Sequence, residues 1–272
     1  MRLAASPLLL LLAPALASAQ WGRGDERVER NAFTWDGAVP AGRTVYVRNL
    51  SGGVRVEPSP DGRVHVTADR RATGDADLRD VRFVQQPAAD GQGVVLCALF
   101  SDGARCDERD YRGNRGNGWS WNRRGGTSAQ FTLRVPASVR LDLETTNGGL
   151  DVRGAGGEVV GRTTNGGISI EGGAGPVTAH TTNGGIAVRL TDLAPTGDFD
   201  LSTTNGGVSL SVPSSLNAEV DMATTNGGVS TDFPVTVQGR INPRRLQVTL
   251  GSGGRRVRMH TTNGGVSLRR SR

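Results

Sequence analysis

The pentapeptide Thr-Thr-Asn-Gly-Gly recurs along the second half of the chain and constrains the fold more than any other feature of the sequence. Successive copies are 18, 18, 22, 21 and 37 residues apart, and they begin at Thr145, Thr163, Thr181, Thr203, Thr224 and Thr261. Repeats of this length are typical of architectures in which similar units stack and bury their apolar faces against one another. The last interval also has room for a degenerate copy that ends near Gly253 and Gly254.

Apolar and polar residues alternate around each copy, as in a β-strand that is buried on one face. In the third copy, Val177, Ala179, Thr181 and Asn183 share one face, and Ile186 resumes this face after the two glycines. Glycine adopts positive φ without steric cost and lets neighbouring backbones approach closely. Each copy therefore predicts a strand, a glycine corner and a second strand.

An Asn-Gly turn can also join two antiparallel strands in a hairpin, so a sandwich or barrel is the alternative fold. Stacking explains the recurrence of the same five residues better, because like side chains then lie side by side at the strand spacing of about 4.8 Å. Inward Asn amides in adjacent coils would bond to one another, which satisfies groups that burial otherwise leaves unpaired. The predicted structural ladder consists of Asn147, Asn165, Asn183, Asn205, Asn226 and Asn263.

The same repeats resemble the signature of a bacterial family of proposed adhesins of unknown function, in which T-T-N-G-G followed by an aliphatic residue recurs. The resemblance covers about residues 45–268 and is strongest over residues 135–268. It implies an exported, right-handed β-helix-like domain, and it supplies no catalytic residues. We therefore expect an all-β solenoid with coils of about 18–22 residues over residues 43–272.

The N-terminus has the positive charge, apolar run and small-residue triplet of a secretory signal peptide. Arg2 precedes an apolar run over residues 3–16, and Ala17-Ser18-Ala19 predicts cleavage before Gln20. An uncleaved membrane anchor is the alternative, although the run is short for a spanning helix. With residues 1–19 removed, we expect no transmembrane segment, a flexible leader or cap over residues 20–42, and a location in the periplasm or at the cell surface.

The chain has two cysteines, Cys97 and Cys106, and export favours a disulfide between them over two free thiols. The bridge would tether the start of a polar segment over residues 101–128, which we expect to be a surface insertion in the solenoid. Trp119 and Trp121 lie within this insertion. Exposed tryptophans of this kind stack on sugar rings or insert at an interface, and the alternative is that they cap the end of the solenoid.

Four carboxylates are predicted at matching outward positions of two coils that follow each other in the sequence. Asp198 and Asp200 belong to the first of these coils, and Glu219 and Asp221 belong to the second. Stacked carboxylates repel one another unless a cation or a basic group lies among them. The set is therefore compatible with an ion-pair surface that includes Arg245, with a Ca²⁺ site, or with the paired acids of a polysaccharide-cleaving enzyme. We favour the ion-pair surface, and expect no cofactor other than Ca²⁺ and no catalytic residues.

All 32 basic residues are Arg, which excludes the lysine chemistry of Schiff-base enzymes and of P-loops. Residues 233–272 contain nine Arg and no Asp or Glu. Such a basic end suits an anionic glycan or the envelope surface, whereas export argues against nucleic acid. The candidate binding residues here are Arg255, Arg256 and Arg258.

Together these features predict a non-catalytic exported envelope or surface protein that acts as an adhesin or a glycan-binding scaffold. Two alternatives remain at this point. One is a polysaccharide-active β-helix enzyme that uses the acidic residues, and the other is a purely structural spacer in the envelope.

Overall fold

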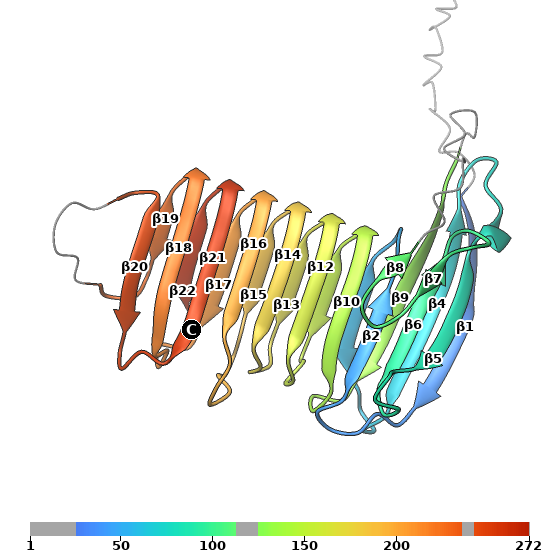
Figure 1. The fold of residues 1–272 in the computed structure, drawn as a ribbon, viewed down its shortest axis with the longest axis horizontal. Helices are drawn as coiled ribbons and strands as arrows, with labels where there is room; N and C mark the ends of the chain where they lie inside the picture. The colour runs from blue at the N-terminus through green and yellow to red at the C-terminus, as the bar shows by residue number, and fades with distance from the viewer. Residues whose placement is uncertain (1–25, 113–124, 236–241, 272) are drawn as a thin grey trace, which may run out of the picture.

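Two long β-sheets face each other along an elongated body in the computed structural model, which describes residues 26–112, 125–235 and 242–271 (Figure 1). The predicted signal peptide, the first residues of the leader, and the tip with Trp119 and Trp121 lie outside the described residues. Within the described part, each sheet contains ten strands. The prediction of an all-β solenoid is confirmed.

The first sheet, sheet A, contains in spatial order β1 (Arg27–Gly37), β4 (Val64–Ala72), β9 (Thr127–Val135), β3 (Val54–Pro58), β11 (Leu150–Arg153), β13 (Ile168–Glu171), β15 (Ile186–Arg189), β17 (Val208–Val212), β22 (Val266–Arg270) and β19 (Val229–Thr231). The second, sheet B, contains β20 (Arg245–Leu250), β18 (Ala218–Asn226), β21 (Arg255–Asn263), β16 (Phe199–Asn205), β14 (Val177–Asn183), β12 (Val159–Asn165), β10 (Arg140–Asn147), β2 (Thr44–Arg48), β6 (Val94–Leu99) and β5 (Arg82–Pro87). From β10 to β17 the chain alternates between the sheets, so each repeat is one coil of two strands.

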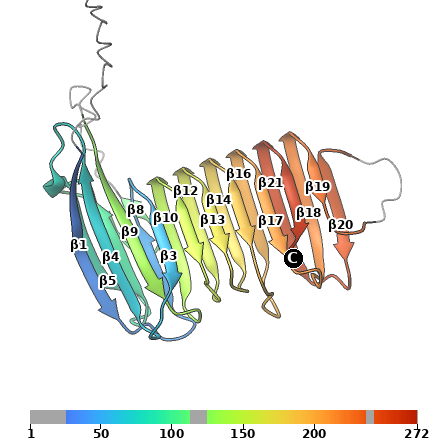
Figure 2. The ribbon, with the colours of Figure 1, turned by 180° about the vertical axis from the view of Figure 1, so that it is seen from behind.

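The core lies between the sheets and consists of the side chains that the alternation predicts to point inward. Val177, Ala179 and Thr181 of β14 are buried, and so are Ile186 and Val188 of β15 on the other side of the corner. Neighbouring strands pair in parallel without slippage, so equivalent residues of successive coils lie side by side. The view from behind shows the same stacking in sheet A (Figure 2).

The glycine corner packs directly on the corner of the preceding coil. Thr181 is buried and its Oγ1 donates a hydrogen bond of 2.9 Å to the carbonyl oxygen of Gly166. A Cβ on Gly184 would lie 2.0 Å from that same oxygen, which leaves no room for a side chain. A Cβ on Gly185 would lie 3.5 Å from the oxygen of Gly207, an ordinary contact distance. The first glycine of the motif is therefore required by close backbone approach, and the second is less constrained.

The six Asn residues of the repeat form one row of amide-to-amide hydrogen bonds, but the row lies on the outside of the corner. Asn183 Nδ2 donates to Asn165 Oδ1 at 2.9 Å, and Asn205 Nδ2 donates to Asn183 Oδ1 at 2.8 Å. All six side chains are exposed, so the expectation that they point inward is wrong. The strand continues to the Asn, but burial ends at the first Thr, since both the second Thr and the Asn of the third copy are exposed.

The order of the last coils differs from the order in the sequence. Strand β21 lies between β16 and β18, so Asn263 donates to Asn205, and Asn226 in turn donates to Asn263 (Figure 1). The degenerate copy expected near Gly253 and Gly254 is not a further coil. Residues 245–250 form the antiparallel edge strand β20, and the two glycines, with φ of 73° and 108°, belong to the turn that leads into β21.

The N-terminal end closes with antiparallel strands. Residues 27–37 of the expected leader or cap form β1, which pairs with β4 at the edge of sheet A, so this part is a cap strand. The expected insertion over residues 101–128 begins with a hairpin of β7 (Arg105–Cys106) and β8 (Tyr111–Arg112). Its last two residues already belong to β9. A short 3-10 helix, η1 (Leu78–Asp80), lies between β4 and β5.

We expect Gly184→Ala to destabilise the protein by about 2–3 kcal/mol, because the new methyl group would overlap the Gly166 carbonyl and separate two coils. Gly185→Ala, which meets no atom closer than 3.5 Å, is the matched control and should cost much less. Urea unfolding of both variants measures the difference. Equal free energies of unfolding would show that close backbone approach at the corner does not limit the fold.

Candidate functional site

Seven charged or polar side chains form one outer face of sheet B, which we call the charged face; six come from four adjacent strands, and Asp198 directly precedes β16. The charged face consists of Asp198, Asp200, Arg256, Arg258, Glu219, Asp221 and Gln247. The register pairs Asp200 of β16 with Arg258 of β21, and Arg258 with Asp221 of β18. Acidic and basic side chains therefore alternate across the strands.

This alternation explains why β21 lies between β16 and β18. The inward patterns of β18 and β21 are almost the same, with Val-x-Met-x-Thr-Thr-Asn in each. In the order of the sequence, however, Asp200 would lie beside Asp221, and like charges on adjacent strands are unfavourable. The observed order places Arg258 between Asp200 and Asp221. The inward residues are compatible with either order of β18 and β21, and the outward charges favour the observed order.

The four carboxylates consequently do not stack as the sequence order predicts, since Arg256 and Arg258 separate the β16 pair from the β18 pair. Arg245 forms an ion pair of 3.4 Å with Asp221, whereas the expectation placed it near Glu219. Within the described ranges, no three His, Cys, Asp or Glu side chains are placed to hold a metal ion together. In the described part of the chain, the pair of Arg245 and Asp221 is the ion pair within 4.0 Å on this face.

A groove of about 510 Å³ crosses the charged face between β18, β20 and β21, and Glu219, Gln247, Arg256 and Arg258 are among the side chains that line it. Arg256 and Arg258 are exposed. In the part of the chain that the structure describes, the side chains of Asp200, Glu219, Arg256 and Arg258 make no hydrogen bond and no ion pair within 4.0 Å. Donors and acceptors along this groove are thus free to bind a ligand.

Arg255 differs from the other two arginines that the sequence singles out. Its Nη2 donates to the carbonyl oxygen of Ala194 at 2.5 Å, and its guanidinium lies 5.6 Å from the centre of the Phe199 ring. Arg255 therefore anchors the loop that precedes β16 and lies outside the groove. The tryptophans at 119 and 121 are outside the described residues, so the structure does not place them.

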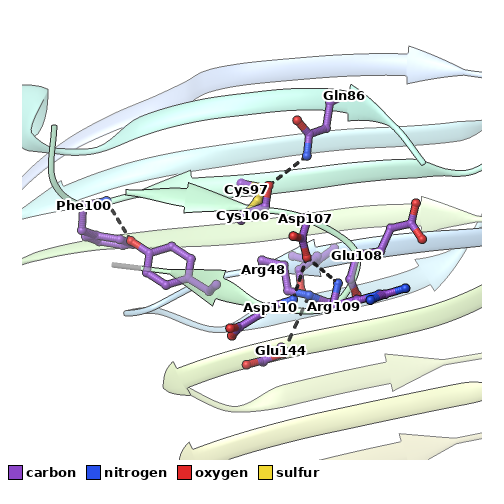
Figure 3. Close-up of a disulfide and its surroundings, with 12 residues drawn as sticks. Arg48, Gln86, Cys97, Phe100, Cys106, Asp107, Glu108, Arg109, Asp110 and Glu144 are labelled. Atoms are coloured by element: carbon purple, nitrogen blue, oxygen red, sulfur yellow. Dashed lines mark hydrogen bonds and ion pairs between the residues drawn. A yellow bond between two sulfur atoms is a disulfide. The ribbon is translucent and has the colours of Figure 1, made fainter. Parts of the chain in front are cut away.

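A second region, which the sequence alone does not reveal, lies under the β7–β8 hairpin. The disulfide between Cys97 and Cys106 joins this hairpin to β6, with the two Cα atoms 6.4 Å apart (Figure 3). Gln86 Nε2 donates to the Cys106 carbonyl at 2.9 Å, and Tyr111 Oη accepts a hydrogen bond from the Phe100 amide at 3.1 Å. Burial raises the pKa of the Tyr111 hydroxyl. The hairpin covers the outer side of β6, which explains why all six residues of this strand are buried.

Arg48 is buried completely beneath this hairpin and connects it to the solenoid. Its guanidinium donates to Asp142 Oδ1 at 3.0 Å and also to the carbonyl of Glu108 in the hairpin turn. The turn itself is held by Asp107, whose carboxylate accepts hydrogen bonds from the backbone amides of Arg109 and Asp110. These amides lower the pKa of Asp107. The available signal in the sequence was only an Arg at the end of a strand, which gives no indication of burial.

Glu144 lies at the border of this cluster, 3.8 Å from Arg48. Burial raises the pKa of its carboxyl group, and although Arg48 and Arg162 oppose this shift, the net change is upward. A carboxyl group whose pKa is higher in the folded state binds more protons there than in the unfolded chain. It therefore reduces stability as the pH rises above the ordinary value of 4.5.

We expect Arg258→Glu to lower the melting temperature by about 2–4 °C, because three carboxylates then lie on adjacent strands. Adding Asp200→Arg to this variant restores the alternation on one side and should recover part of the loss. Thermal unfolding of the single and double variants provides the measurement. A loss that Asp200→Arg does not reduce would contradict the role of charge in ordering these strands.

The pKa of Glu144 gives a pH-dependent prediction. Glu144→Gln cannot ionise, so its melting temperature should rise relative to that of the unmodified protein as the pH increases from about 4 to 7. The comparison is made by thermal unfolding at a series of pH values. A difference that is constant with pH, or that falls, would be inconsistent with a raised pKa at this position.

Comparison with known proteins places the chain by its sequence. A family model described as Toastrack DUF4097 matches residues 39–269. Among solved structures, the chain is similar to a "putative cell adhesion protein" from Clostridium sporogenes, with 10% identity, 92% of this chain and 100% of that chain covered, and a TM-score of 0.39. It is also similar to a "putative adhesin" from Bacteroides fragilis, with 11% identity and a TM-score of 0.38. This similarity covers 90% of this chain and 97% of that chain.

A "putative adhesin" from Parabacteroides distasonis has 12% identity and a TM-score of 0.27, and the similarity covers 90% of this chain and 98% of that chain. The search of curated proteins found no match. The family model spans the repeats and the N-terminal strands other than β1, in agreement with the resemblance that the T-T-N-G-G motifs show, and the chain therefore belongs to the Toastrack DUF4097 family.

Proposed function

We propose that this protein is a non-catalytic, exported envelope protein that binds a glycan along the charged face of sheet B. The observation that carries the proposal is the set of free charged side chains in one groove. Glu219 provides acceptors there, and Arg256 and Arg258 provide donors. Sugar hydroxyl groups both donate and accept hydrogen bonds, so a groove with both kinds of partner is suited to them.

The charge of this groove favours a neutral glycan over an anionic one. Two arginines of the expected basic end, Arg256 and Arg258, lie on β21 between strands that carry acidic residues. Arg256 pairs with Glu219 on one side, and on the other its backbone amide donates to Asp198 Oδ1 at 2.9 Å; Arg258 lies between Asp200 and Asp221. An anionic polymer that contacts the two arginines would also meet these carboxylates, which costs free energy at each contact.

Two observations support export. The first 19 residues have the pattern of a secretory signal peptide. The disulfide between Cys97 and Cys106 is of the kind that persists in oxidising compartments such as the periplasm and the cell surface. Among the described residues, the structure contains no helix of the length and apolarity needed to span a bilayer.

A glycan array with the mature chain tests the binding function and identifies the ligand. We expect a neutral glycan to bind, and Arg258→Ala and Glu219→Ala each to weaken its affinity by about tenfold, since each removes a hydrogen bond to a charged group in the groove. Arg189→Ala is the matched control, because Arg189 is an exposed arginine of sheet A paired with Glu171 at 3.2 Å. It should leave the affinity unchanged.

The salt dependence of binding distinguishes the ligand classes. Affinity for a neutral glycan should change little between about 0.05 and 0.5 M NaCl, whereas contacts between arginine and an anionic polymer are screened over this range. A steep loss of affinity would reject the neutral ligand in favour of an anionic glycan. The absence of any saturable glycan would instead support a purely structural role.

A further inference from the structure

The two sheets end in four edge strands, and three of these carry features that hinder pairing with another chain. Strand β1 has a register shift between Glu29 and Phe33, with Asn31 at a φ of 49°. Strand β5 ends at Pro87. Strand β19 has only three residues. Bulges, prolines and short lengths are the usual means by which proteins prevent edge-to-edge association.

Strand β20, at the far end of sheet B, has none of these features. Its six residues, Arg245–Leu250, contain neither proline nor glycine and pair with β18 in an unbroken antiparallel register. Polar and apolar side chains alternate along it. The inward side chains of Leu246 and Val248 are only partly buried, because the coil ends here.

The hydrogen-bond pattern shows which backbone groups point away from the protein. The Thr224 amide donates to the Arg244 carbonyl at 2.9 Å, which marks this pair as hydrogen-bonded. Bonded pairs recur at every second residue of an antiparallel ladder, so Leu246 and Val248 bond to β18. The amide and carbonyl groups of Gln247 and Thr249 therefore face the open edge.

We propose that β20 is a homodimerisation strand, which pairs in antiparallel orientation with β20 of a second copy and joins the two B sheets end to end. A two-fold axis at Gln247 sets the two Gln247 residues opposite each other as a hydrogen-bonded pair. Thr249 then donates to the Arg245 carbonyl of the second copy. The Arg245 amide is not needed, since it already donates to Asn242 at 3.3 Å within its own turn.

The side chains of this pairing are compatible with one another, which is the reason that a second copy fits the edge. Arg245 lies opposite Thr249 of the second copy, so no like charges face each other across the new pair. On the inner face, Leu246 lies opposite Val248 of the second copy, and each covers apolar surface that the end of the coil leaves partly exposed. The pairing thus completes both the hydrogen bonding and the core at this end.

Sedimentation velocity of the mature chain over a range of concentrations tests the proposal. We expect a monomer–dimer equilibrium, and we expect Gln247→Pro to weaken it at least tenfold, because proline removes the amide at the axis and leaves the bonds of Leu246 and Val248 to β18 in place. Gln247→Ala keeps that amide and should dimerise like the unmodified protein. Melting temperatures establish that both variants are folded.

A cysteine variant tests the same pairing without relying on proline. Hydrogen-bonded residues on antiparallel strands have Cα atoms about 5.5 Å apart, which permits a disulfide. Gln247→Cys should therefore form a covalent dimer on mild oxidation, whereas Thr182→Cys, exposed on the middle of the solenoid, should not. A protein that stays monomeric up to about 100 µM, a Gln247→Pro variant that dimerises as well as Gln247→Ala, or a series of larger oligomers would each overturn the proposal.

Discussion

The contact between successive glycine corners is the constraint on which the rest of the structure depends. At each corner the backbone of one coil rests against the backbone of the preceding coil, and a buried threonine hydroxyl donates to the glycine carbonyl at that point. Because the contact requires glycine at a fixed distance from the threonine, it sets the register of both adjoining strands. Inward residues then face the core, and outward residues fall into continuous rows across the sheets.

Much of the fold could be predicted from the sequence because this contact repeats. The alternation around the motif identifies which residues of a coil are buried, as Val177 and Ile186 show. The same alternation misplaced Asn183, since burial ends at Thr181 although the strand continues to Asn183. Local periodicity predicts which side chains share a face, but it does not show where the core between the two sheets ends.

The order of strands and the role of Arg48 could not be predicted in this way. Strands β18 and β21 have the same inward pattern, so hydrophobic burial permits either one beside β16. The distinction comes from the outward charges of residues such as Arg258 and Asp200, which act only between strands that are already neighbours. Arg48 depends likewise on a hairpin contributed by residues about 60 positions later in the chain. In both cases the decisive interaction links distant segments and has no local signature.

The insertion of β21 between β16 and β18 has a consequence for how the protein folds. Residues 255–270 form an internal layer of the stack, although in the sequence they follow residues 218–231, which form the layer outside them. Until they arrive, the coil of residues 218–231 has no partner on that side, and the edge of β16 stays open. Strands β21 and β22 therefore complete the middle of this part of the molecule, so the stack cannot form coil by coil in the order of the sequence.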